Sequence, residues 1–185
     1  LDIEDLHAVV LRLWELPERE YQYAACDLLF SRRRELPSAW VADPIQHFVT
    51  TKPWWDTVDA LGATITPLVH RDSSLVSLMW AWLRSGDRWL TRAAIGHQRG
   101  LKQSTDMRRL LAMCDEVAGN REFFVAKAVG WALRDATAWD PQSVRRFVSD
   151  HPGLPAVARR EAERGLARAA PRDERYRDVA QNRRA

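Results

Sequence analysis

The feature that most constrains the fold is the spacing of apolar side chains, which recur at i, i+3 and i+4 along almost the whole chain. No stretch alternates at period two between hairpin turn signals, so β-strands are not expected. The pattern therefore predicts an all-α fold. Breakers and capping residues divide it into about ten helices, near 3–15, 17–34, 39–50, 54–66, 73–84, 87–101, 106–118, 121–138, 141–150 and 154–169.

The expected helix starts agree with the chemistry of helix termini. Asp87 or Thr105 can cap a helix N-terminus, and three prolines fit first-turn positions: Pro17, Pro141 and Pro155. Pro44 falls inside the third expected helix, where a proline should kink or shorten it.

The expected helices group into five hairpins whose second members begin near 17, 54, 87, 121 and 154, a spacing of about 33 to 37 residues. Such hairpins stack into a curved solenoid whose second helices line a concave wall, where a long peptide or nucleic acid can bind. The tetratricopeptide consensus is not visible, which favours HEAT-like hairpins. We expect one repeat domain over residues 1–170 and a basic tail over 171–185, which can be disordered.

Composition excludes several classes of protein. The chain has 185 residues, of which 46% are hydrophobic and 29% charged, and it contains no apolar run long enough to cross a bilayer. Cys26 and Cys114 lie in apolar helical sequence without metal-ligand spacing, as expected of buried reduced thiols in a cytosolic protein. The five histidines are scattered, so we expect no metal site and no cofactor.

The net charge of +3 is unevenly distributed along the chain. From Arg159 onward, nine arginines stand against five acidic residues, whereas the rest of the chain is close to neutral. A basic tail is compatible with attraction to phosphate, but it is equally typical of a solvated end. Charge alone therefore does not establish nucleic-acid binding.

Two adjacent indoles stand in TKPWWDTVD, residues 51–59. On a helix from about residue 54, one apolar stripe faces the core, formed by Trp54, Val58, Leu61 and Ile65. Trp54 is therefore predicted to be structural. The neighbouring stripe is Trp55, Asp59 and Gly62, where a carboxylate is unlike a core residue and glycine leaves room for a ligand. Periodicity alone leaves open whether this stripe is a site or ordinary surface.

Two more segments place cations beside an indole. In the helix over 121–138, Lys127, Trp131 and Arg134 share a face next to Gly130, which suits contact with a phosphate–sugar backbone but equally suits the junction of two repeats. In GDRWLTRAAI, Arg92 follows Arg88 by one turn, and its guanidinium is expected to reach outward beside two small residues.

Three of these segments, TKPWWDTVD, WLTRAAI and REFFVAKAVGWALR, together with LWELPEREYQYAACDLL, resemble the DNA alkylation repair family of HEAT-like-repeat DNA glycosylases, the AlkD-like enzymes. The resemblance extends to about residue 165. It implies a cytosolic, monomeric, monofunctional enzyme that hydrolyses the N-glycosidic bond of N3- or N7-alkylated purines in double-stranded DNA. It also implies a lesion held in the duplex without base flipping. The family's N-terminal helices have no counterpart here, and we expect that part of the native N-terminus is missing.

The family's motif residues fall on four positions of this sequence. The second Trp of WWD-x-x-D is Trp55, its last Asp is Asp59, the Arg of WL-x-R is Arg92, and the indole of KA-[IV]-G-W is Trp131. The resemblance implies that Asp59 stabilises a cationic sugar and positions water, that both indoles pack on the deoxyribose, and that Arg92 keeps Asp59 oriented and ionised. Phosphate contacts are expected from Lys52, Lys127, Arg134 and Arg88.

A second hypothesis stays open beside the glycosylase. The chain can instead be a non-catalytic solenoid that binds DNA or a protein through the same face. A carboxylate facing phosphates argues against a pure DNA binder, because the two charges repel.

Overall fold

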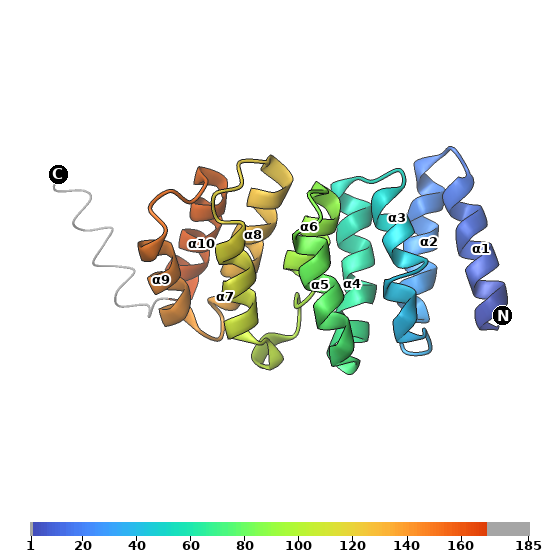
Figure 1. Cartoon of the computed structure of the whole chain (residues 1–185), viewed down its shortest axis with the longest axis horizontal. Coiled ribbons are helices and arrows are strands. Elements are labelled where there is room, and N and C mark those ends of the chain that lie inside the picture. Colours follow the sequence, from blue (N-terminus) through green and yellow to red (C-terminus); the bar gives the residue numbers. More distant parts are fainter. Residues whose placement is uncertain (1, 170–185) are drawn as a thin grey trace. The chain divides into compact units, whose positions relative to one another are not determined.

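A computed structural model describes residues 2–169 (Figure 1), and over these residues the chain is all-helical, without a strand. The α-helices are α1 (Ile3–Glu15), α2 (Arg19–Ser31), α3 (Ile45–Thr50), α4 (Trp55–Arg71), α5 (Val76–Leu83), α6 (Arg88–Gly96), α7 (Met107–Glu116), α8 (Phe123–Ala136), α9 (Pro141–Asp150) and α10 (Ala156–Ala169). Short 3-10 helices are η1 (Ser38–Val41), η2 (Ser73–Leu75) and η3 (Lys102–Ser104). The all-α prediction is confirmed. The tail expected over 171–185 lies outside the described residues.

The chain divides into two compact units after Leu101. Unit 1 holds α1 to α6, and unit 2 holds α7 to α10. The expectation of a single repeat domain over 1–170 stays a prediction.

The helices of each unit pack as successive hairpins. In unit 1, α1 packs on α2, α3 on α4, and α5 on α6; in unit 2, α7 packs on α8 and α9 on α10. The second helices also pack on one another, α2 on α4, α4 on α6, and α8 on α10. They begin at residues 19, 55, 88, 123 and 156, within two residues of the expected starts. The predicted repeat of helical hairpins is therefore present.

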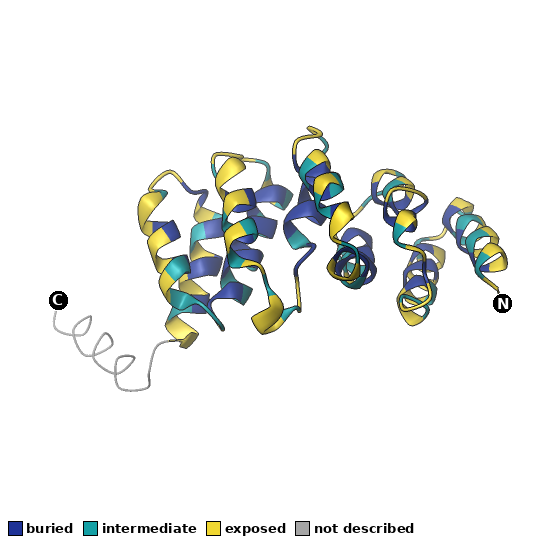
Figure 2. Cartoon of the chain, turned by 60° about the horizontal axis from the view of Figure 1, so that its bottom comes forward, coloured by how far each residue is buried: buried dark blue, intermediate teal, exposed yellow. Residues whose placement is uncertain are grey.

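The core of each unit lies between the helices, where their apolar stripes meet (Figure 2). In α1 the stripe is Leu6, Val10 and Trp14, spaced by four residues. Hairpins of this length cannot bury such a stripe alone, so each hairpin is stabilised by the next one in the array.

Two prolines shape unit 1 differently from each other. At Pro44 the expected helix 39–50 is interrupted, and the segment becomes η1, a cis Asp43–Pro44 bond and the short α3. Pro67, by contrast, lies inside α4, which continues to Arg71 instead of ending near residue 66. Burial of Leu68 and Val69 beyond the proline offsets its cost of about 3 kcal/mol.

Side-chain caps begin five of the ten α-helices in the described part of the chain. Asp87 caps α6 by accepting from the Trp89 and Leu90 N–H groups, as expected, whereas α7 is capped by Asp106 and not by Thr105. Pro141 occupies the first turn of α9 as predicted. Pro17 and Pro155 stand just before their helices instead of in the first turn, because α2 and α10 each begin two residues later than predicted.

Neither cysteine is a candidate nucleophile in this fold. Cys26 and Cys114 are both buried and free, and burial raises the pKa of each thiol to about 12. Both therefore remain protonated at neutral pH. Over residues 2–169, no helix combines the length and apolarity that crossing a membrane requires.

Candidate active site

The indoles at the start of α4 are both exposed. Trp54 is 45% exposed and Trp55 41%. Trp54 precedes the helix in extended backbone, with φ −148° and ψ 159°, so the helical phase that buries Val58, Leu61 and Ile65 does not extend to it. The prediction that Trp54 lies in the core stripe is wrong. Its ring instead stacks obliquely on Trp89 of α6, with centroids 6.1 Å apart.

Asp59 lies one turn after Trp55 on the same face of α4 and meets Arg92 of α6. The Arg92 Nε donates to Asp59 Oδ1 at 2.8 Å, and Nη2 donates to Oδ2 at 2.8 Å. The Arg92 side chain is 3% exposed, whereas that of Asp59 is 20% exposed. The guanidinium therefore points into the α4–α6 junction, and the expectation that it reaches outward is wrong.

This pair orients the carboxylate by a two-point contact. A bidentate guanidinium fixes both the position and the plane of a carboxylate, and charge-assisted bonds of this length are the strong ones. Gly62 lies one turn further along α4, and a Cβ added to it would meet no atom of another element within 4 Å, so the face beside Asp59 is open. The result is a fixed, partly exposed negative charge one turn from an exposed indole.

A second arginine, Arg99, approaches the same carboxylate. Its Nη1 lies 3.4 Å from Asp59 Oδ2, and its side chain is 44% exposed. With two guanidinium groups around one carboxylate, these three residues carry a net charge of +1. That charge reduces the repulsion that Asp59 alone would exert on a phosphate backbone.

Asp56, three residues before Asp59, is held by α2. Arg19 Nη2 donates to Asp56 Oδ1 at 2.7 Å, Tyr23 donates its hydroxyl to Oδ2 at 2.7 Å, and the Thr57 N–H donates to Oδ1 at 2.6 Å. Partial burial acts to raise the pKa of the Asp56 carboxyl, but these hydrogen bonds together lower it below its ordinary value. The first turn of α4 is thereby fixed to α2.

Lys52 is engaged within the chain. Its Nζ donates to the carbonyl oxygens of Trp14, Glu15 and Leu16, each at 2.8 Å, at the end of α1. Carbonyls at a helix C-terminus have no intrahelical partner, so a lysine there is a favourable cap. The structure therefore shows Lys52 in a capping role, and its expected phosphate contact stays a prediction.

Arg88 begins α6 and is exposed. Its guanidinium lies over the Trp89 ring, 5.5 Å from the centroid. Trp54, the residue before α4, contacts the same Trp89 ring. One aromatic ring is therefore approached both by Arg88 and by the exposed indole of Trp54.

Unit 2 carries Trp131 with its two flanking cations. Lys127 Nζ and the Arg134 guanidinium lie 5.6 and 5.7 Å from the centroid of the half-buried Trp131 ring. Both cations also reach the buried Glu161 of α10, at 2.7 and 2.6 Å. The expected cluster of Lys127, Trp131 and Arg134 on one face is present.

The sequence pattern left open whether Gly130 makes room for a ligand or lies at the junction of two repeats. The structure shows the second. A Cβ at this position would lie 2.9 Å from the Ala158 Cα and 2.9 Å from the Glu161 Cβ. Gly130 is buried and allows α8 and α10 to pack closely, because any larger residue would push the two helices apart.

Comparisons with known proteins show which family the chain belongs to. The family model for DNA alkylation repair enzymes matches residues 1–166. The chain belongs to this family. The solved structure of a "Predicted DNA alkylation repair enzyme from Enterococcus faecalis" is 29% identical, with a TM-score of 0.79, and the match covers 88% of this chain and 76% of that one. No curated protein matches the chain.

In this member of the DNA alkylation repair family, the motif residues fall in both units. Trp55, Asp59 and Arg92 belong to unit 1, where the structure joins Asp59 to Arg92, and Trp131 belongs to unit 2. Among the described residues, no group of three or more His, Cys, Asp or Glu side chains is arranged to hold a metal ion. The groups that α4 presents are the oriented carboxylate of Asp59 and the exposed indole of Trp55.

Sequence reasoning missed two sets of partners in this repair-family site. Arg99, which contacts Asp59, lies in the turn after α6 and is not part of any motif. Arg19 and Tyr23 contact Asp56 across 37 and 33 residues of sequence, respectively. The repeat length itself was the signal: residues one repeat apart on successive second helices face each other, as Asp59 and Arg92 do at a separation of 33 residues.

Unit 2 of this repair-family member should lose stability in acid through Glu161. The hydrogen bond from Lys127 lowers the pKa of Glu161, and the nearby Arg134 adds to this, although burial acts in the opposite direction. A lowered folded-state pKa adds stability above the unfolded value of about 4.3, and this stability is lost as pH falls through the lower folded value. We expect the thermal midpoint of wild type to fall more steeply between about pH 5 and pH 3 than that of Glu161→Gln. Parallel curves would show that Glu161 adds no pH-dependent stability.

Proposed function

We propose that this protein is a monofunctional alkylpurine DNA glycosylase, acting as a monomer. It hydrolyses the N-glycosidic bond of cationic N3- or N7-alkylated purines in duplex DNA. The observation that carries this proposal is the Asp59 carboxylate, which Arg92 holds by two hydrogen bonds and which is 20% exposed, one turn after the exposed Trp55.

The family resemblance implies the substrate class, and the chemistry that these residues offer supports it. Alkylation places a positive charge on the purine, which then leaves without needing a strong general acid. The remaining barrier comes from the cationic character that develops at the sugar, as in other glycosidic cleavages. A carboxylate fixed in advance stabilises that charge and orients the attacking water without reorganising during the reaction.

The indoles serve the same cationic sugar. An indole face beside a developing cation contributes about 0.5–2 kcal/mol. Trp55 is exposed and lies one turn before Asp59 on α4, which suits packing against the deoxyribose. By resemblance to the family motif, we also propose that Trp131 of unit 2 packs on the deoxyribose.

The charges around these residues suit a phosphate backbone. Arg88 is exposed at the start of α6, and Lys127 and Arg134 flank Trp131 in unit 2. Although Glu161 pairs with both of the latter, Arg164 lies 3.5 Å from the same carboxylate, so three cations surround one anion. We propose that these residues hold the backbone of an unflipped duplex.

The test is release of 7-methylguanine from alkylated duplex DNA by the wild-type protein. Release of the free base, with an abasic site left in an uncut strand, supports a monofunctional glycosylase. Binding of the duplex without base release would instead identify a non-catalytic binder, and absence of both would point to a protein partner.

Trp131→Ala should slow base release by about 2- to 30-fold, the range that follows from one lost aromatic contact with a cation. The ring is half-buried, so far-UV circular dichroism should remain close to that of wild type. Phe123→Ala, which removes an exposed ring from the first position of the same helix, is the matched control and should have little effect. Loss of helical signal in Trp131→Ala would assign the indole to packing.

A further inference from the structure

Arg99 occupies a defined position in the turn that follows α6. The Arg99 N–H donates to the Gly96 carbonyl at 2.9 Å, and the next residue, Gly100, has φ +83°. A glycine accepts this left-handed conformation without strain, so the turn closes immediately after Arg99. The turn places the Arg99 guanidinium beside Asp59 Oδ2.

The two arginines around Asp59 hold it in different ways. Arg92 is buried and makes two bonds of 2.8 Å, whereas Arg99 is 44% exposed and contacts Asp59 at 3.4 Å. Exposed ion pairs contribute little to stability and are screened by salt, whereas a buried bidentate pair is costly to break. The Arg99 contact is thus the one that an incoming anion can replace.

Occupation of Oδ2 by Arg99 has a cost for the chemistry proposed above. A carboxylate stabilises a sugar cation less well when a second guanidinium already neutralises it. A DNA phosphate carries the same charge as Asp59, binds arginine well and is present only when the substrate is bound. The phosphate and Asp59 therefore compete for one guanidinium.

We propose that Arg99 is a phosphate-binding switch of the active site. In the free protein it covers Asp59 Oδ2; in the complex it turns to a phosphodiester group of the duplex and leaves Asp59 paired with Arg92 alone. The proposed contact between Arg99 and phosphate does not depend on the glycosylase function, whereas the uncovering of Asp59 rests on that proposed function.

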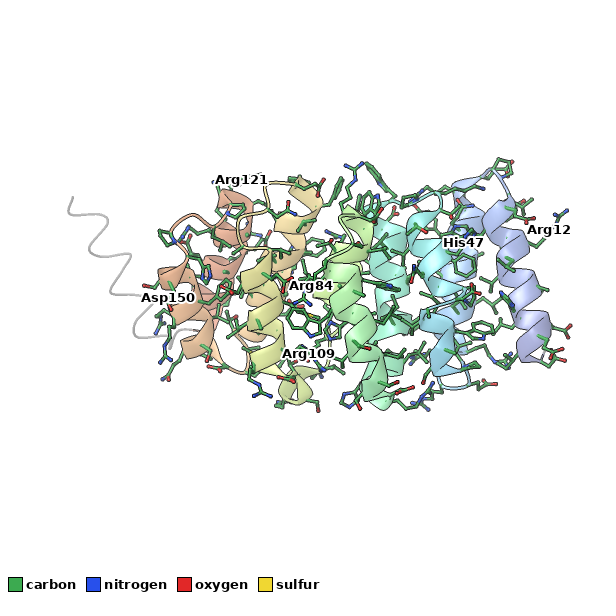
Figure 3. The ribbon with its side chains drawn as sticks, viewed as in Figure 1. Arg12, His47, Arg84, Arg109, Arg121 and Asp150 are labelled. Carbon is green, nitrogen blue, oxygen red and sulfur yellow. The ribbon has the colours of Figure 1, made fainter. Side chains whose placement is uncertain are left out.

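The first experiment measures binding to an undamaged duplex over a series of salt concentrations. Wild type is compared with Arg99→Gln, Arg99→Lys and the control Arg12→Gln. Arg12 also forms an ion pair, with Glu15 on its own helix, and its side chain points away from the other helices of unit 1 (Figure 3). The control therefore removes the same charge from unit 1 at a site where no DNA contact is proposed.

We expect Arg99→Gln to weaken binding about tenfold and to reduce the slope of log affinity against log salt by about 0.9, the contribution of one phosphate contact. Arg99→Lys should retain most of the slope, because it keeps the charge, and Arg12→Gln should match wild type. A slope for Arg99→Gln equal to that of wild type overturns the proposal.

The second experiment measures single-turnover release of 7-methylguanine as a function of protein concentration. For Arg99→Gln the loss should lie in the concentration needed for half-maximal rate, because Asp59 is already uncovered in this variant. A maximal rate lowered by more than about twofold overturns the switch and makes Arg99 a support of Asp59 like Arg92. If wild type itself releases no base, the glycosylase proposal fails, and the salt slopes still decide the phosphate contact.

Discussion

Asp59→Asn is expected to lower the single-turnover release of 7-methylguanine by about 100- to 1,000-fold, the usual loss when one preorganised electrostatic group is removed from an active site. Asparagine keeps the size and planar shape of the side chain and can still hydrogen-bond to Arg92. It lacks the negative charge that faces the developing sugar cation. Because the loss is in the chemical step, affinity for undamaged duplex should not fall and can rise, since a charge that repels phosphate is gone.

Asp56→Asn is the matched control for this result. It makes the same change of charge three residues earlier on α4, in a carboxylate bound by Arg19 and Tyr23 of α2. Its loss of release should be at least about tenfold smaller than that of Asp59→Asn. Equal release by Asp59→Asn and wild type would remove Asp59 from the mechanism, and equal losses in both variants would indicate a structural effect on α4.

Arg92→Ala is expected to lower the free energy of unfolding by about 3 kcal/mol, the lower end of the range for breaking a buried ion pair. The variant leaves the Asp59 carboxylate at the α4–α6 junction without its two strong hydrogen bonds. The low end applies because Asp59 is 20% exposed and water can reach it. Chemical denaturation followed by circular dichroism measures the effect, and base release should fall as well, because the carboxylate loses its fixed orientation.

Arg92→Lys distinguishes charge from geometry in the same experiment. Lysine keeps the cation but cannot make the two-point contact, so we expect partial recovery of stability and little recovery of base release. Arg12→Ala should change stability by less than about 0.5 kcal/mol, since its ion pair is exposed. A loss below about 1 kcal/mol in Arg92→Ala would show that water replaces the guanidinium without difficulty.

The positions of the hairpins could be predicted from the sequence, because helix-breaking residues and the spacing of apolar residues indicate the same helix boundaries in each repeat. The stripe of Val58, Leu61 and Ile65 is buried as expected. The error at Trp54 arose at the boundary: its backbone is extended, so helical phase begins one residue later and turns the indole outward. The position of Asp59 followed from the same phase, because it lies inside the helix.

The side chains that cross between helices were less predictable. Nothing in a single sequence distinguishes an arginine that reaches solvent from one that reaches a neighbouring helix, and Arg92 does the latter. Gly130 illustrates the same limit, because a missing side chain serves a ligand or a neighbouring helix equally well. The charge of Lys52 predicts a phosphate contact, but the sequence does not reveal that its ammonium group reaches the carbonyl oxygens at the end of α1. Each of these depends on contacts one repeat away.

The ion pairs between second helices affect how the chain opens. In unit 1, α4 is joined to the helix before it through Asp56 and Arg19 and to the helix after it through Asp59 and Arg92. In a linear array each hairpin contacts only its neighbours, so these pairs act as nearest-neighbour coupling. Detaching one hairpin leaves an uncompensated charge on the next, which makes partial opening unfavourable. The helix that carries the proposed catalytic carboxylate therefore opens together with its neighbours. This folding cooperativity keeps the carboxylate in position as long as unit 1 stays folded.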